Sequence, residues 1–188
     1  MKFDNNGNFL ILEEEVIQIF SSALKRLVIE DKHLLESGTQ ERALQFKLAL
    51  YLRELFKFAE CGGLNIDVEY NRDGVSNVKR PMTDCQNSNS EKWFAPDIIL
   101  HERGSAGLEE EKKYKNDIIY CEIKKDSISG NHDSERIKKQ MIERKYQYGI
   151  NLYSLGKEEI LLDLYTDTNV PPKSYKFNNK TKKMELFS

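Results

Sequence analysis

The stretches 94-FAPDIILHERG-104 and 116-NDIIYCEIKK-125 decide the fold of this chain. Each contains a short run of isoleucine and other apolar residues, and such runs predict two neighbouring β-strands. Successive side chains of a strand point to opposite faces of the sheet. We therefore expect Glu122 and Lys124 to share one face, while Ile123 points into the hydrophobic core.

Asp97 lies in the first of these runs, directly after Pro96. If the two strands pair, Asp97 meets the face that carries Glu122 and Lys124. Two carboxylates and one ammonium group in one place are costly to bury without a further partner. A divalent cation held by Asp97 and Glu122 would relieve the repulsion and leave Lys124 for substrate or water.

These two half-motifs, a Pro-Asp pair ending at Asp97 and the Glu-Ile-Lys triplet 122–124, resemble the PD-(D/E)xK nuclease superfamily of bacterial and phage-type proteins. The resemblance covers about residues 37–166. It implies that Asp97 and Glu122 bind Mg²⁺, with Mn²⁺ as a substitute, and that Lys124 assists the attacking water. The backbone carbonyl of Ile123 is a further candidate oxygen ligand.

Glu41 is the fourth candidate of the site. Helical spacing of apolar residues predicts one helix over 12–35, and a break with a capping signature at 37–40 predicts a second helix to about Phe58. In many proteins of the resembled family, a helix before the sheet lends an acid to the metal site. Glu41 matches that place, with Gln45 one turn later on the same face. The alternative is a first-turn glutamate that favours the helix dipole.

A polar loop between the predicted strands holds the candidate nucleic-acid contacts. Alternation over 64–70 predicts a strand with one polar face, and residues 71–89 read as a long loop. Arg72, Lys79 and Arg80 form a basic patch within it. The patch can hold phosphates, or it can be an ordinary solvated loop.

We expect four further strands, at residues 94–101, 118–124, 150–155 and 160–166. A helix over 133–146 separates the second of these strands from the third. The helix is strongly basic, which indicates a solvated face or, alternatively, contact with a nucleic-acid backbone. The order ααβββαββ predicts an α/β (α+β) fold with a central mixed sheet flanked by helices. The resemblance adds the three-layer, restriction-endonuclease-like topology. Residues 167–188 read as a loose C-terminal extension, with a short final strand near 184–187.

Composition limits the class of protein. A chain of 188 residues predicts a single domain, and the net charge of −2 gives no global positive field for nucleic acid. Three cysteines, at 61, 85 and 121, form neither a disulfide framework nor a zinc pattern, and we expect Cys121 to be buried in its strand. The polar start is unlike a signal peptide, and no apolar run reaches the length of a membrane span. We expect a soluble protein of a reducing cytoplasm.

The sequence thus favours a magnesium-dependent endonuclease that hydrolyses phosphodiester bonds, with DNA as the favoured nucleic acid. The modest charge favours a targeting partner protein, and a homodimer is the alternative, because enzymes that cut both strands often need two sites. Two other interpretations stay open. The chain can be a binding module for nucleic acid or protein on the same fold, because a fold does not entail an activity. Asp97, Glu122 and Lys124 can also form a buried structural ion-pair cluster, closed to solvent.

Overall fold

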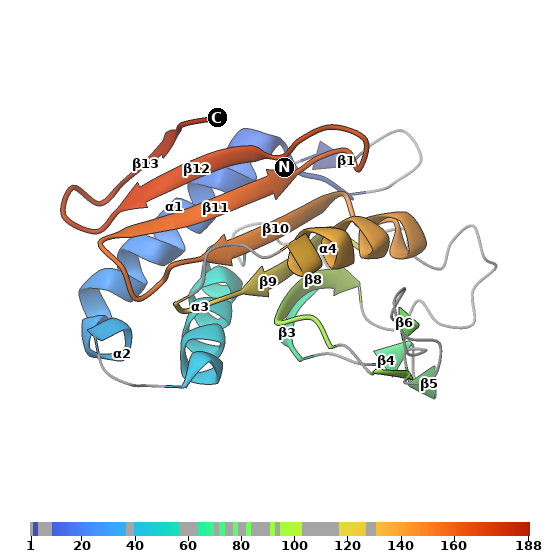
Figure 1. Ribbon diagram of the computed structural model, residues 1–188, viewed down its shortest axis with the longest axis horizontal. Coiled ribbons are helices and arrows are strands. Elements are labelled where there is room, and N and C mark those ends of the chain that lie inside the picture. Colours follow the sequence, from blue (N-terminus) through green and yellow to red (C-terminus); the bar gives the residue numbers. More distant parts are fainter. Residues whose placement is uncertain are drawn as a thin grey trace.

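The computed structural model describes residues 10–36, 40–56, 64–69, 95–102, 117–126 and 132–188, and the backbone alone of 2–3, 9, 72–73, 77–78, 82–83, 91–92 and 131. Its centre is a mixed sheet of seven strands in the order β13-β12-β11-β10-β9-β8-β3 (Figure 1). The strands are β3 (Leu64–Val68), β8 (Ile98–Glu102), β9 (Ile119–Ile123), β10 (Tyr148–Tyr153), β11 (Glu159–Tyr165), β12 (Lys173–Asn178) and β13 (Lys183–Leu186). Three isolated pairs of two-residue strands also occur, namely β1 (Lys2–Phe3) with β2 (Phe9–Leu10), β4 (Arg72–Asp73) with β5 (Asn77–Val78), and β6 (Met82–Thr83) with β7 (Glu91–Lys92).

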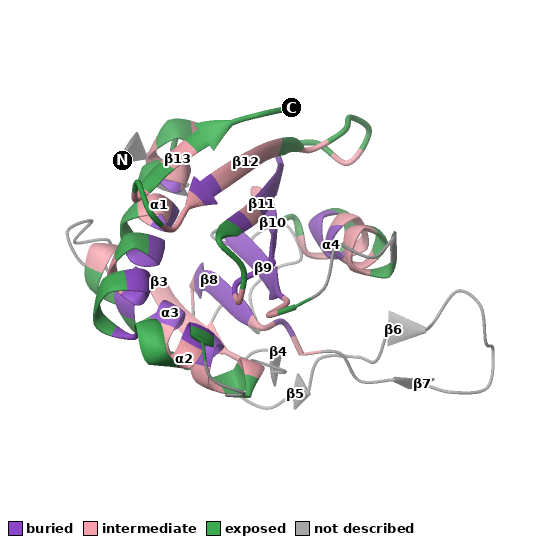
Figure 2. Ribbon diagram, turned by 60° about the vertical axis from the view of Figure 1, so that its left-hand side comes forward, coloured by how far each residue is buried: buried purple, intermediate pink, exposed green. Residues whose placement is uncertain are grey.

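Helices cover both faces of the sheet. The helices α1 (Glu13–Glu30) and α3 (Glu41–Phe56) lie on one face, and α4 (Asn131–Arg144) lies on the other (Figure 2). A short helix, α2 (Lys32–Glu36), connects α1 to the segment before α3. Within the seven-stranded sheet, β9 and β10 pair in parallel, whereas the other neighbours are antiparallel. A parallel pair needs a crossover connection, and α4 supplies it.

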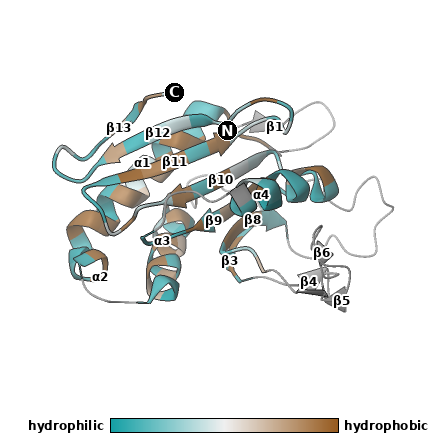
Figure 3. Cartoon of the chain, viewed as in Figure 1, coloured by the Kyte–Doolittle hydropathy of each residue, from teal (hydrophilic) through white to brown (hydrophobic). Residues whose placement is uncertain are grey.

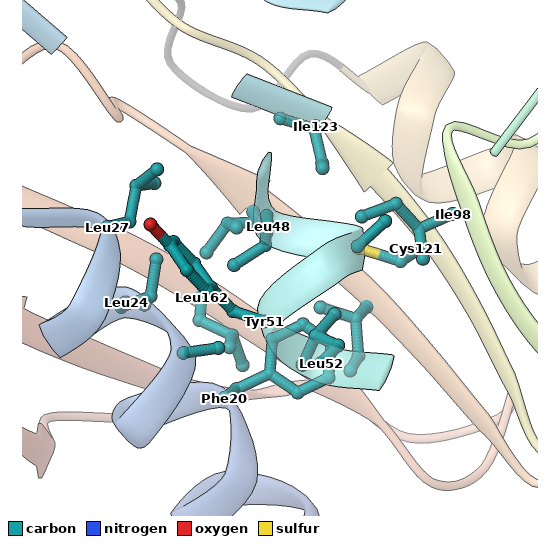
Figure 4. Close-up of a cluster of buried hydrophobic side chains, with 14 of the residues drawn as sticks. Phe20, Leu24, Leu27, Leu48, Tyr51, Leu52, Ile98, Cys121, Ile123 and Leu162 are labelled. Atoms are coloured by element: carbon teal, nitrogen blue, oxygen red, sulfur yellow. The ribbon is translucent and has the colours of Figure 1, made fainter. Parts of the chain in front are cut away.

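The larger hydrophobic core lies between the sheet and the pair α1 and α3 (Figure 4). Phe20 and Leu24 of α1 and Leu48 of α3 are completely buried there. Ile98 and Cys121 face them from the sheet, as the alternation within these strands predicts. The expected burial of Cys121 is confirmed.

The second core, under α4, is smaller and combines apolar with polar groups. Ile99, Tyr120 and Tyr165 of the sheet pack there against Ile137 of α4. The helix approaches so closely that a Cβ atom at Gly149 would lie 2.2 Å from Ile137 Cγ2. The rest of α4 is largely hydrophilic (Figure 3), so this face of the sheet has less apolar cover than the other.

The expected mixed α/β architecture is confirmed, with two corrections in the order of elements. The helix predicted over 12–35 is interrupted at Asp31, whose carboxylate accepts a hydrogen bond from Tyr51 and lies 3.1 Å from Lys47 Nζ. The buried carboxylate satisfies its charge by these contacts with α3, and the chain turns there.

The segment 167–188 is the second correction, because β12 lies where a loose extension was expected, whereas β13 matches the short final strand expected near 184–187. Phe177 of β12 is fully buried in the larger core, and the Tyr175 hydroxyl donates a hydrogen bond of 2.9 Å to Glu13 Oε1. These contacts attach the tail to the sheet and to the start of α1. Among the helices of the described part, none is both long and apolar enough to cross a membrane.

Candidate functional site

The sheet register places Asp97 across from Glu122. Ile98 is the partner of Cys121 in the antiparallel pair of β8 and β9, so the next position along aligns Asp97 with Glu122. Asp97 itself lies one residue before β8, where the sequence had placed it inside the strand. The expected meeting of the two half-motifs at one end of these strands is therefore found.

The Asp97 carboxylate connects the end of β9 to α3. Its Oδ2 accepts a hydrogen bond of 2.6 Å from the backbone N–H of Ile123, and its Oδ1 accepts one of 2.8 Å from Gln45 Nε2. Two donors from different elements thus hold one carboxylate in a fixed orientation. Gln45 Oε1 is buried and has no hydrogen-bond partner among the described residues, so one more oxygen faces this region unsatisfied.

Glu41 and Lys124 form the open part of the site. Glu41 stands in the first turn of α3, and its Oε1 lies 3.6 Å from Lys124 Nζ. Its Oε2 accepts a hydrogen bond of 3.0 Å from the backbone N–H of Lys125. The side chains of Lys124 and Glu41 are 32% and 33% exposed, so a substrate or water can reach the ammonium group.

Glu122 forms the closed part of the site, and its residue is only 2% exposed. Tyr120 donates its hydroxyl to Glu122 Oε1 at 2.5 Å, and one terminal nitrogen of Arg136 donates to Oε2 at 3.0 Å. The same Arg136 nitrogen lies 2.6 Å from Asp133 Oδ1. Glu122 therefore faces α4, while Lys124 is turned toward α3. The expectation that these two side chains share one face is wrong, because β9 ends at Ile123 and Lys124 pairs with Glu41 of α3. The contact of Glu122 with Arg136 supports the interpretation as a structural ion pair for this part of the site.

Burial shifts the pKa values of two carboxyl groups of the site toward their neutral forms. Burial raises the pKa of Glu122 to about 8, against the opposing effect of the Arg136 charge, and the Asp97 charge raises it further. Burial also raises the pKa of Asp97, with the backbone hydrogen bond from Ile123 acting against it. The contacts show which other charged groups belong to the site.

The carboxylates joined by these contacts and interactions are Glu41, Asp97, Glu122 and Asp133, and the cations are Lys124 and Arg136. Fully ionised, this set carries two uncompensated negative charges. A divalent cation would balance them.

The donor set fits magnesium by chemistry, although it does not form a closed cage. In the described part of the chain, no three His, Cys, Asp or Glu side chains gather closely enough to hold one ion. Mg²⁺, however, is usually bound through one or two carboxylates and keeps several waters. The N–H of Ile123 points to Asp97, and the N–H and C=O of a strand residue point to the same neighbour, so the Ile123 carbonyl faces the Asp97 side.

The predicted site residues fall into two groups. Asp97, Glu41 and Lys124 come together with the Ile123 backbone next to the start of α3, whereas Glu122 lies at the same end of β9 and faces α4. Of the nucleic-acid candidates, Arg72 belongs to β4 with only its backbone described, and Lys79 and Arg80 lie outside the described residues.

Arg136 and Tyr120 belong to the site, and the sequence analysis did not single them out. Tyr120 precedes Glu122 by two residues, so strand alternation alone places both on one face. Arg136 follows Asp133 by three residues on a helix, which signals their mutual contact. Its contact with Glu122 has no local signal, because it depends on how the crossover helix lies over β9.

Comparisons with protein-family models, with curated proteins and with solved structures found no match. The residue types of the site are three carboxylates, one accessible ammonium group and one half-buried guanidinium group.

Proposed function

We propose that this chain is a metal-dependent nuclease of the PD-(D/E)xK type, hydrolysing phosphodiester bonds in nucleic acid, with DNA as the favoured substrate. The supporting observation is that Asp97 and Glu41, from two other elements, meet the end of β9 beside Lys124, and that Glu122 lies two residues earlier on the same strand. A constellation with an excess of acid, raised carboxyl pKa values and an accessible amine is typical of a catalytic site.

Asp97 and Glu122 would hold the Mg²⁺ ion, with the Ile123 carbonyl as a third oxygen and Glu41 completing the set directly or through water. The raised pKa values of Asp97 and Glu122 support this assignment, because they mark carboxylates that gain most from a nearby positive charge. When bound, the ion would supply a water of lowered pKa and balance charge on the phosphate.

The residues of the chain have separate roles in this hydrolysis. Lys124 orients the attacking water and balances the negative charge that develops on the phosphate oxygens. Glu41 holds the ammonium group of Lys124 toward the site. Gln45 and the Ile123 N–H fix the orientation of Asp97. The attack forms a new P–O bond and breaks the ester P–O bond, leaving a phosphate monoester and a free hydroxyl group.

The proposal extends to the fold, for which we infer the restriction-endonuclease-like core. Its support is a sheet with helices on both faces, in which the two half-motifs lie on the adjacent strands β8 and β9 and a helix precedes them. The additional strands β12 and β13 extend that core at the sheet edge. A cytoplasmic setting and a targeting partner or homodimer belong to the same proposal.

The second candidate function is a binding module without catalysis. It is favoured by one specific contact, the ion pair of buried Glu122 with half-buried Arg136, which keeps one of the proposed ligands away from solvent. In a binding module this pair would be permanent. A titration calorimetry experiment with Mn²⁺ separates the two functions, because a permanent pair leaves no site for the ion and gives no heat.

The nuclease proposal is tested by a cleavage assay on single- and double-stranded DNA and RNA. We expect the wild type to cleave at least one of these with Mg²⁺ or Mn²⁺ and none of them in EDTA. Asp97→Asn, which keeps the shape of the side chain and removes its charge, should lose the cleavage. Absence of cleavage on every substrate, together with absence of heat in the Mn²⁺ titration, would favour the binding module.

A further inference from the structure

Asn151 of β10 is a completely buried polar residue that the proposed mechanism does not use. It is 0% exposed, and neither Nδ2 nor Oδ1 has a hydrogen-bond partner among the described residues. An unsatisfied buried amide destabilises a protein, because the group loses its water without replacing it. Such a group is retained at a cost in stability, and functional sites are where proteins tolerate that cost.

The register places Asn151 between two buried carboxylates. Asn151 is the partner of Glu122 in the parallel pair of β9 and β10, and of Asp163 in the antiparallel pair of β10 and β11. Residues directly opposite one another in neighbouring strands point to the same face of the sheet. One row of aligned positions therefore crosses the sheet, from the residue before β8 through β9 and β10 to β11. Its members are Asp97, Glu122, Asn151 and Asp163.

Both carboxylates are at present bound by other donors. Glu122 accepts hydrogen bonds from Tyr120 and Arg136, and Asp163 Oδ1 accepts one of 2.6 Å from the Ser174 hydroxyl. Glu122 thus has Asp97 on one side and Asn151 on the other. A cation between Asp97 and Glu122 would take over the charge balance that Arg136 now supplies.

We propose that Asn151 is a positioning residue for Glu122, donating an N–H of its amide to this carboxylate when Glu122 turns from Arg136 toward a bound divalent cation. The inference rests on the proposed metal site. Carboxylate ligands of metals are held by outer hydrogen bonds, and loss of such a partner weakens metal binding by about 10- to 100-fold. The amide is thus unsatisfied in the metal-free protein and satisfied in the metal-bound protein.

The decisive variant is Asn151→Leu, which has a similar size and no polar atoms. We expect its thermal midpoint in EDTA to rise by roughly 2–4 °C, because the unsatisfied amide is removed. Its affinity for Mn²⁺, measured by calorimetry, should fall by about 10- to 100-fold. Asp163→Asn, on the other side of Asn151, is the matched control and should bind Mn²⁺ as the wild type does.

If Asn151 were purely structural, Asn151→Leu would not raise the thermal midpoint and lower the Mn²⁺ affinity together. Wild-type Mn²⁺ affinity in Asn151→Leu would overturn the inference and leave the nuclease proposal standing. A lower thermal midpoint in this variant would overturn it too, since it would mean that the amide is satisfied in the free protein. Absence of Mn²⁺ binding in the wild type would contradict both proposals.

A second measurement on the wild type covers the case in which Asn151→Leu does not fold. The side-chain amide protons of Asn151 can be followed by NMR in ¹⁵N-labelled protein during addition of Mg²⁺. We expect them to shift downfield as the new hydrogen bond forms, and to stay in place in Asp97→Asn. Unchanged Asn151 amide signals in a wild type that binds Mg²⁺ would overturn the inference.

Discussion

Lys124→Ala is expected to reduce cleavage by at least about 100-fold, the loss typical when a group that stabilises transition-state charge is removed. The substitution leaves the two acids and Gln45 in place, so binding of the metal should change little. Stability should also change little, because Lys124 is one-third exposed and its contact with Glu41 is a 3.6 Å surface pair. The measurements are single-turnover cleavage with Mg²⁺ and thermal unfolding of the same preparations.

Lys157→Ala is the matched control for this variant. Lys157 is exposed in the turn between β10 and β11, and its backbone N–H rather than its side chain makes the turn contact with Ser154. The control should therefore cleave as the wild type does. Equal cleavage by the wild type and Lys124→Ala would mean that the activity is a contaminant or that the assigned role of Lys124 is wrong.

Arg136→Leu is expected to lower the free energy of unfolding by about 3 kcal/mol at pH 10 in EDTA, where Glu122 of the wild type is ionised, because the substitution removes the charged partner of this buried carboxylate. The loss should be smaller at pH 5. The reason is that Glu122 then binds a proton, and a neutral buried carboxyl group needs no cation. Urea denaturation at the two pH values measures the difference.

The direction of this pH effect follows from the pKa of Glu122. Its folded value is about 8 against an ordinary value of 4.5, so the metal-free protein loses stability as the pH rises through this interval. Arg136 lowers the pKa of Glu122, so its removal raises that pKa further and extends the loss to higher pH. Glu122→Gln combined with Arg136→Leu should recover most of the stability. An Arg136→Leu defect that is equal at pH 5 and pH 10 would contradict the assignment.

The central strands were predictable from the sequence because local patterns determine them. The isoleucine runs of β8 and β9 are short, apolar and bounded by polar segments, and this pattern is typical of buried strands. With those strands adjacent, alternation and register bring Asp97 to Glu122 without further information. Glu41 was singled out differently, through the resemblance, which gives an acid of the helix before the sheet a place at the metal site.

The contacts of Glu122 with α4 were not predictable from the sequence. They join segments that are distant in sequence, and several residues of the same type could have made them. Arg136 is one of several basic residues on α4, and its choice as the partner of Glu122 depends on the path of the crossover between β9 and β10. The segment of β12 is mostly polar, with Tyr175 and Phe177 as its apolar residues, so its alternation gave too little signal for a buried strand. Such elements are decided by tertiary packing rather than by local propensity.

The proposed hydrolysis requires that the acids of the two half-motifs jointly bind a divalent cation. This can be seen in a wild-type crystal soaked in Mn²⁺, with anomalous data. We expect an anomalous peak about 2 Å from carboxylate oxygens of both Asp97 and Glu122, with Glu122 turned away from Arg136, and no peak in Asp97→Asn soaked identically. A wild-type crystal with no peak there, and with Glu122 still paired to Arg136, would contradict it.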